Sequence, residues 1–413
     1  MSIELIALLS LFVAIAIGYF TNVNTGVLGI AMAFLVGTFL ADMTGKEIIA
    51  GFPTSTFVTL MSMTFLFSIA KVNGTMETMA YKVIQLAKGK TKLIPHLFFV
   101  FAAILSAVGA GPIVTPALLC PIATSVGKKE NIKDIIMLMC VICGGLVGGL
   151  TPFGPSGIVA STLFESSGIA PYTPVMLSAV VIHIVQYAVV FTIIGGWKIK
   201  NQGVREGEEV PSFNKNQWLT VAVILCVVLA AMFLGWDIAL VALLGSSVLL
   251  ILKASDQAKS IAGVPWGTLL LVGGVSVLIN VINSVGGIQL LSDALSSIMS
   301  ENTASSIICC MAGLLSAVSS ASGVVMPTLI PTVTEISAGL GGAVAPAALG
   351  AAVCLGAHLV TCSPLSTIGA LGYSAANAET DKNKLFMQQL GLAVLSVLIG
   401  AAMGLLGVFN WFL

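Results

Sequence analysis

Apolar runs of about 20 residues recur along this chain, from Ile3 to the last residue, Leu413. A helix of that length crosses roughly 30 Å of hydrocarbon. Only 8% of the 413 residues are charged and 57% are hydrophobic, which leaves too little polar surface for a water-soluble globule. No soluble domain of useful size fits between the runs. The sequence therefore predicts an all-α polytopic protein of the cell (inner) membrane, with the lipid bilayer as its surroundings.

Three further features narrow the class of protein. The first run, from Ile3 to Phe20, lacks a basic leader and an Ala-x-Ala cleavage site, so we interpret it as a retained span. The formal net charge of zero argues against a nucleic-acid partner. Cys140 and Cys143 form a Cys-x-x-Cys, but without a second pair or a nearby histidine they are better explained by helix packing than by metal or redox chemistry.

The sequence repeats itself at a nearly constant offset. "GFPTSTFVTL" at residue 51 is answered by "GVPWGTLLLV" at 263, an offset of 212. "LSAV" at 105 returns at 315, and "TPFGPSG" at 151 corresponds to "TCSPLST" at 361, each at an offset of 210. Three matches in the same order indicate a duplicated unit of about two hundred residues.

Each unit is predicted to contain a re-entrant hairpin and a broken helix among its spans. We expect a first repeat at 1–197, a cytoplasmic linker at 198–216 and a second repeat at 217–413. The hairpins fall at about 93–127 and 304–335, and the broken helices at 133–164 and 344–376. The other expected spans are 3–20, 25–43, 54–72, 174–197, 217–235, 237–252, 266–283 and 385–412, with connecting helices around 76–88 and 286–300.

The number of crossings predicts that the second unit is inverted. A hairpin that returns to its own side adds no crossing, so each unit crosses five times and the second repeat starts on the opposite side. With both termini outside, 16 of the 17 basic residues lie on the cytoplasmic side and only Lys46 lies outside, as the positive-inside rule requires. The first hairpin then opens to the cytoplasm and the second to the exterior.

Four stretches rich in Gly, Pro, Ser and Thr interrupt helices at membrane depth. Such backbone is tolerated only where protein or a wet cavity satisfies its polar groups. Small residues also serve close helix packing, but the occurrence of four at equivalent positions favours a binding function. The stretches are the hairpin tips Val108-Gly109-Ala110-Gly111-Pro112 and Ser319-Ser320-Ala321-Ser322-Gly323, and the interruptions 151–157 and 361–367.

These stretches supply neutral groups for an anion and for a small cation. Helix N-termini after each tip and interruption favour an anion, while free carbonyls and hydroxyls suit a cation. We expect substrate contacts from the tips and from nearby polar residues, and a sodium site of neutral oxygens. The substrate residues are Gly109, Ala110, Gly111, Pro112, Ser156, Ser319, Ser320, Ser322, His358, Ser366 and Thr367. The sodium residues are Gly111, Thr151, Gly154, Ser322, Thr361 and Ser363.

The positions of the ionisable residues help to distinguish between alternative functions. No Asp or Glu lies near the middle of a span, which argues against a cation exporter, and the single arginine, Arg205, lies in the linker. His358 is expected to bond the substrate, to carry a coupled proton, or to pack against a carbonyl. His183 and His96 are expected to pack or to lie at an interface.

The order of elements resembles a known superfamily. "GFPTSTFVTLMSMTFLFSIAKVNG", the hairpin and "GGLVGGLTPFGPSGIVAS" together resemble the ion transporter superfamily, including divalent anion/sodium symporters, and are most similar to MatC-type malonate and dicarboxylate carriers. The symporters carry Ser-Asn-Thr at both tips, where this chain has Gly109-Ala110-Gly111-Pro112 and Ser320-Ala321-Ser322, without asparagine. The resemblance implies a homodimer, in which a scaffold holds a mobile domain, and elevator-type transport.

The predicted function is secondary active transport of small di- or tricarboxylates such as malonate or succinate. Sodium is the expected coupling ion, with a proton as the alternative, and no other cofactor is expected. A carrier of another small anion or of cations in the same superfamily is a second hypothesis. An intramembrane enzyme is a weaker one, because "GPSGI" lacks the Gly-x-Ser-x-Gly spacing and two membrane-depth aspartates are missing. The broken-helix plan also disfavours a channel.

Overall fold

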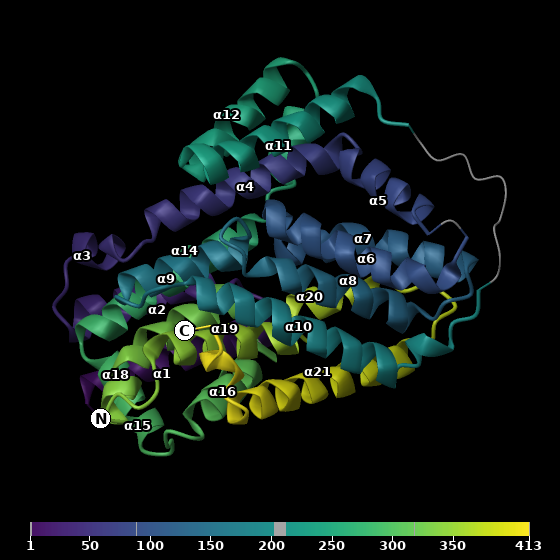
Figure 1. Ribbon diagram of the computed structural model, residues 1–413. Helices are drawn as coiled ribbons and strands as arrows, with labels where there is room; N and C mark the ends of the chain where they lie inside the picture. The colour runs from purple at the N-terminus through teal and green to yellow at the C-terminus, as the bar shows by residue number, and fades with distance from the viewer. Residues whose placement is uncertain (1, 88, 202–211, 318, 413) are drawn as a thin grey trace.

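The computed structural model describes residues 2–87, 89–201, 212–317 and 319–412, and over these residues every regular element is a helix. Residues 202–211 of the expected linker, including Arg205, lie outside the described residues, as do Lys88 and Val318. Among the described residues, eight helices are long and apolar enough to cross a membrane, or nine with one bent pair. The predicted all-α polytopic fold is therefore confirmed (Figure 1).

The helices of the first half follow the predicted order, with ends within a few residues of those expected. The span predicted at 54–72, for example, is the helix α4, Thr54–Val72. The main helices of this half are α1 (Ile3–Thr21), α2 (Thr25–Leu40), α3 (Gly45–Ala50), α4, α5 (Thr75–Gln85), α6 (Ile94–Leu105), α7 (Gly111–Lys129), α8 (Asp134–Gly149), α9 (Pro155–Ser166) and α10 (Thr173–Ile193).

The second half contains the same elements in the same order. Its main helices are α11 (Lys215–Leu234), α12 (Ile238–Ile251), α13 (Gln257–Ala262), α14 (Trp266–Ser284), α15 (Gly287–Ser296), α16 (Ala304–Ala317), α17 (Met326–Leu329), α18 (Val333–Gly339), α19 (Pro346–Leu359), α20 (Thr367–Ser374) and α21 (Lys382–Leu405).

Two short helices, α3 and α13, were missed by the sequence analysis. Each has six residues and precedes the long helix of its half, α4 or α14. Thr44 caps α3 in a capping box with Glu47, and the side chain of Asp256 caps α13 by accepting from the N–H of Lys259. Such short helices show no hydrophobic period, so their caps are the signal that could have revealed them.

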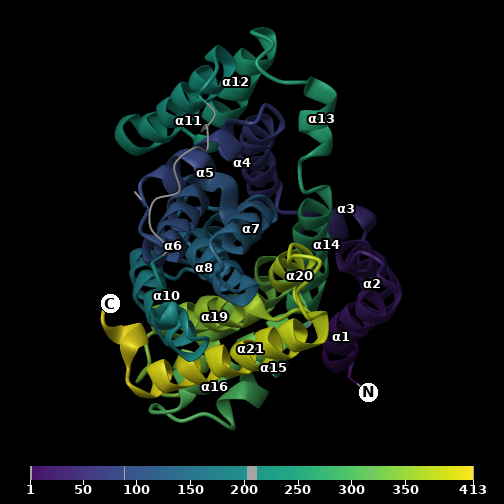
Figure 2. The same ribbon diagram turned by 90° about the vertical axis from the view of Figure 1, so that its right-hand side faces the viewer.

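The first hairpin is formed by α6 and α7, which lie side by side in Figures 1 and 2. Its tip contains Gly109 with φ 125° and Gly111 with φ 74°, backbone conformations that favour glycine. At the open end, the hydroxyl of Thr91 donates a hydrogen bond to Oε2 of Glu130 over 2.9 Å. The two outer ends of the first hairpin therefore lie next to one another.

The second hairpin is formed by α16 and the segment Ala321–Gly339, which are bent by 119° relative to one another. Ser320 has an extended backbone and caps the returning arm, because its Oγ accepts from the N–H of Gly323 over 3.1 Å. Both arms pack against α19. This hairpin is therefore the counterpart of the first.

Equivalent contacts recur in the two halves. Ser106 donates to the carbonyl of Gly145 and Ser316 donates to that of Ala357, both over 2.6 Å. A Cβ added at Gly144 would collide with the carbonyl of Phe99, and one at Gly356 with that of Cys309. The internal repeat is thus present in the packing, while the orientation of the halves across a membrane stays a prediction.

The central helices α8 and α19 are apolar around their whole circumference and are buried accordingly. Figure 2 shows them in the middle of the molecule, with α1–α3 on one side and α11–α12 at one end. Gly144 and Gly356 permit the close approach of the hairpin arms α6 and α16 to these helices. The hairpins are therefore held against the centre of the fold.

Candidate functional site

Both hairpin tips and the first interruption line one small cavity between the central region and the helices α4 and α14. Ala110 and Pro112 come from the first tip, Pro155 and Ser156 from the interruption, and Ser322 from the second tip. The opposite wall is formed by side chains of α4, α14 and the residue before α14, namely Leu60, Thr64, Pro265, Thr268 and Leu269. Segments more than two hundred residues apart in sequence therefore meet at this place, which we call the inner cavity.

The inner cavity is small and its lining is electrically neutral. Its volume is about 30 Å³, which is room for about a water molecule or two but not for a dicarboxylate. No Asp, Glu, Lys, Arg or His is among its lining residues. The first turns of α7 and α9 begin here. Pro112 and Pro155 have no N–H, while the other N–H groups of these first turns have no acceptor within their own helices. The cavity therefore offers backbone dipoles and hydroxyls rather than charges.

Close packing fixes the first tip against its neighbours. A Cβ added at Gly109 would collide with Cε of Met63 on α4, and one at Gly111 would lie 2.5 Å from Cδ of Pro155. The hydroxyl of Thr151 donates to the carbonyl of Ala107 over 2.8 Å, so it ties the interruption to the tip. The N–H of Gly154 donates to the carbonyl of Thr151, which closes the turn before α9.

The second tip presents one free hydroxyl to the cavity. Ser319 donates to the carbonyl of Leu315 over 2.6 Å, and Ser320 serves as the cap described above. Ser322 lines the inner cavity and makes no hydrogen bond to another described residue through its side chain. Of the three serines expected to bind substrate here, Ser322 is thus the one with a free hydroxyl in the cavity.

The second interruption does not line the inner cavity, although substrate and sodium contacts were expected from it. Its hydroxyls close the turn on itself: Thr361 donates to the carbonyl of His358 over 2.6 Å, and Ser366 donates to those of Thr361 and Ser363. Oγ of Ser363 accepts from the N–H of Leu365, and Thr367 begins α20. Three expected contacts, Thr361, Ser363 and Ser366, thus use their side-chain hydroxyls within this turn, and Thr367 is exposed.

His358 lies behind the first tip. A Cβ added at Gly149 would be 3.2 Å from Cε1 of His358 and 3.1 Å from Cγ of Pro112. The rings of His358 and His183 are 6.0 Å apart, and Nδ1 of His358 and Nε2 of His183 are buried without a hydrogen-bond partner among the described residues. Nδ1 of His183 is 2.9 Å from Oε1 of Gln186. The two imidazoles thus form a buried pair beside the site.

His96 packs against other side chains, which is one of the two roles expected for it. Its Nδ1 is 2.6 Å from the hydroxyl of Tyr187, and its ring also contacts Phe191. Cys140 and Cys143 are buried free thiols. Within the described part of the chain, no group of three His, Cys, Asp or Glu side chains could hold a metal ion.

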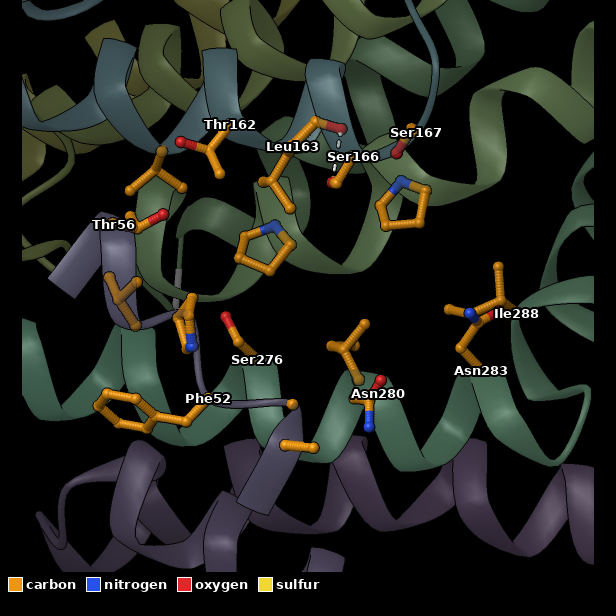
Figure 3. A pocket seen from close by; sticks show the side chains of 18 of the residues that line it. Phe52, Thr56, Thr162, Leu163, Ser166, Ser167, Ser276, Asn280, Asn283 and Ile288 are labelled. Carbon is orange, nitrogen blue, oxygen red and sulfur yellow. Dashed lines mark hydrogen bonds between the residues drawn. The ribbon is translucent and has the colours of Figure 1, made fainter. Parts of the chain in front are cut away.

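A larger cavity of about 550 Å³ follows the inner cavity along the same helices. Along α14 the inner cavity ends at Leu269 and the larger one begins at Val272; along α9 the corresponding residues are Ser156 and Val159. Its outer end, at Asn283, is exposed. We call this space the vestibule; Figure 3 shows it between α9 and α14.

The vestibule contains polar residues that the sequence analysis missed. Ser276, Asn280 and Asn283 of α14 line it, together with Thr56 of α4 and Thr162 of α9 (Figure 3). The signal was available, because the three α14 residues follow at intervals of four and three in a largely apolar span.

The apolar helices define a multi-pass membrane protein, and the chain is similar to proteins described as transporters. The chain is 25% identical over 305 residues to uncharacterized transporters of Mycobacterium bovis and Mycobacterium tuberculosis, covering 68% of this chain and 68% of each relative. Its fold is similar to the crystal structure of the YdaH transporter of Alcanivorax borkumensis, with a TM-score of 0.57, 13% identity and 88% of each chain covered.

The family resemblance is carried by the N-terminal part. Residues 1–149 match the family described as the N-terminus of the dicarboxylate carrier protein MatC. This segment contains α1–α8, including the whole first hairpin. The similarity to MatC-type carriers expected from the sequence is thereby confirmed.

Proposed function

We propose that this protein is a secondary active carrier, and not an enzyme, that moves small di- or tricarboxylates such as malonate or succinate across the cell (inner) membrane. The observation that carries the proposal is the meeting of both hairpin tips and the first interruption in one uncharged cavity at helix N-termini. Backbone N–H groups and the Ser322 hydroxyl can donate to a carboxylate there. The match to the MatC N-terminus supports this class of substrate.

The two cavities support a cycle of alternating access. The vestibule of about 550 Å³ is open at one end, whereas the inner cavity of about 30 Å³ is too small for the solute. A movement of the tips and interruptions relative to α4 and α14 would enlarge the inner cavity and then expose it on the other side. In an elevator-type cycle, α8, α9, α19, α20 and the hairpins move as one body within a homodimeric scaffold.

Sodium is the proposed coupling ion. Ser322 lines the inner cavity, and Gly111, Thr151 and Gly154 belong to the first tip and the first interruption, of which other residues line it. The carbonyl and hydroxyl oxygens of these four residues are ligands suited to a hard monovalent cation. An ion bound there would neutralise part of the charge of the carboxylate. Sodium affinity and substrate affinity would then rise together.

Proton coupling is the second candidate, and the buried pair His183 and His358 favours it. Each ring has a nitrogen without a partner among the described residues, and the pair adjoins the first tip through Pro112. A proton shared by this pair would add one positive charge beside the substrate. Replacement of His358 by glutamine would then abolish proton-driven uptake, whereas sodium-driven uptake would persist.

Uptake by purified protein in liposomes tests the proposal. Labelled malonate, succinate and citrate are offered under an inward sodium gradient, under an inward proton gradient and under neither. We expect accumulation of at least one dicarboxylate above its external concentration under the sodium gradient. Liposomes without protein and the variant Asn216→Ala, which changes an exposed residue of α11, serve as controls. If no carboxylate accumulates under either gradient, the proposal fails.

A further inference from the structure

One face of α14 carries three polar side chains on a helix that is apolar for most of its length. Ser276, Asn280 and Asn283 are separated by four and three residues, so they lie on the same face. All three line the vestibule, and Figure 3 shows the hydroxyl of Ser276 directed toward α9, with Asn280 one turn further along α14. Polar groups at this depth need water or a ligand to satisfy them.

These side chains have free hydrogen-bonding groups. Neither the hydroxyl of Ser276 nor the amides of Asn280 and Asn283 bond to another described residue. Ser284, the next hydroxyl on the same helix, instead donates to the backbone carbonyl of Asn280 over 2.8 Å. The stripe of Ser276, Asn280 and Asn283 is therefore not used to hold the fold together.

The internal repeat provides a comparison for Asn280. At an offset of 212, Asn280 corresponds to Ser68 on α4, and Gly51 corresponds to Gly263. Both pairs pack closely: a Cβ at Gly51 would lie 2.9 Å from Cγ of Asn280, and one at Gly263 would collide with Oγ of Ser68. Ser68, however, donates to the carbonyl of Ser260 over 2.7 Å, whereas the amide of Asn280 has no such bond. Close packing against Gly51 therefore explains why position 280 carries a side chain, but it does not explain why that side chain has a free amide.

The opposite wall of the vestibule adds donors without adding positive charge. Thr56, on α4, is 4% exposed, lines the vestibule and makes no side-chain hydrogen bond to a described residue. No Lys or Arg is among the lining residues, and the one acid, Glu335, belongs to the returning arm of the second hairpin. Amide and hydroxyl donors can hold an oxyanion weakly enough to release it again.

We propose that Ser276, Asn280 and Asn283 form an outer station that binds a carboxylate group of the solute before it reaches the inner cavity. This inference rests on the proposed function. From the station the solute passes along α14, from Val272 to Leu269, into the space between the tips. The station supplies on α14 the amide donors that the Gly109–Pro112 and Ser320–Ser322 tips lack.

The test compares substrate affinity on the two faces of the membrane. Asn280→Leu keeps the branched shape and the number of heavy atoms of the side chain but removes its donors. Uptake of labelled malonate and labelled succinate is measured in sided proteoliposomes of both orientations. On the face where the vestibule opens, we expect KM to rise about tenfold, the effect of losing one hydrogen bond to a charged group. KM on the other face and the maximal rate should stay as in the wild type.

Two further variants make the test decisive. Asn283→Leu changes an exposed residue that tolerates substitution and should raise KM on the same face. Asn216→Ala, on α11, should leave both faces unchanged. An unchanged KM in Asn280→Leu and Asn283→Leu, or an equal rise on both faces, would overturn the outer station while leaving the transport function standing. A wild-type protein that transports no carboxylate would instead overturn the proposed function itself.

Discussion

At the scale of single residues, the first tip depends on glycine for two different reasons. Gly109 has φ 125°, which other residues rarely adopt, and a side chain there would also collide with Met63 and meet Phe67 at 2.8 Å. Gly111 has φ 74° and packs on Pro155. Strain and steric exclusion thus act together at the point where the chain reverses inside the fold.

Gly109→Ala should therefore destabilise the protein by about 1–3 kcal/mol from backbone strain, with additional loss from the collision with Met63. Thermal unfolding of the detergent-purified protein measures this as a lowered Tm. Gly391→Ala is a suitable control, because Gly391 lies inside the helix α21 and has nothing within 4 Å of an added Cβ. Equal melting temperatures for the two variants would show that the tip is not constrained as described.

Two serines that were expected to have the same role should behave differently. Ser322 has a free hydroxyl in the inner cavity, so Ser322→Ala should raise KM for the carboxylate about tenfold and leave Tm unchanged. Ser366 caps α20 and bonds two carbonyls, so Ser366→Ala should lower stability by about 1 kcal/mol. Uptake kinetics and thermal unfolding of both variants check this pair. The reverse pattern would contradict the assignment of Ser322 to the cavity.

At the scale of elements, the sequence was sufficient for most helix positions and insufficient for side-chain directions. The bounds of a long apolar run predicted the ends of α4, and the Gly- and Pro-rich stretches predicted the positions of both tips. The sequence could not reveal that Ser366 and Thr361 close their own turn, because a hydroxyl near a helix end serves equally well as a cap or as a ligand. The spacing of Ser276, Asn280 and Asn283 places them on one face of α14, but it does not predict that α9 lies opposite that face.

Glu335 of α18 places a negative charge among the residues that line the vestibule. Its removal in Glu335→Gln should lower KM for a dianion roughly two- to fourfold at low ionic strength, because each pair of unit charges about 10 Å apart in water contributes about 0.4 kcal/mol. The difference should disappear in high salt. Glu301→Gln, which changes an exposed residue in the loop before α16, is the control. An identical KM in wild type and Glu335→Gln at low salt would contradict an entry path past α18.

At the scale of the whole molecule, the elements of the first half recur in the second, and both halves contribute residues to the inner cavity. Equivalent contacts such as Ser106 with Gly145 and Ser316 with Ala357 recur, while the vestibule extends from the inner cavity toward Asn283 of α14. If the halves are inverted in the membrane, exchanging the conformations of the two repeats would open the site on the other side. A closed inner cavity beside an open vestibule is therefore the arrangement expected in one conformation of such a cycle.

The inverted orientation can be tested at equivalent positions of the short helices α3 and α13. Lys46 and Ala258 are both exposed and are separated by the repeat offset of 212. In a background where the exposed Cys226 is replaced by serine, Lys46→Cys should react with an impermeant maleimide in intact cells, and Ala258→Cys only in inverted vesicles. Reaction of both from the same side would show that the halves are parallel.

The most direct test of the central claim, that both hairpin tips bind the same solute, is protection of the tips by substrate. Ala110→Cys and Ser322→Cys line the inner cavity from different halves of the chain and are alkylated separately, during turnover, in a background without Cys226 and Cys310. We predict that malonate or succinate, whichever is transported faster, slows alkylation at both positions. Protection at one tip only, or at neither, would contradict a shared site.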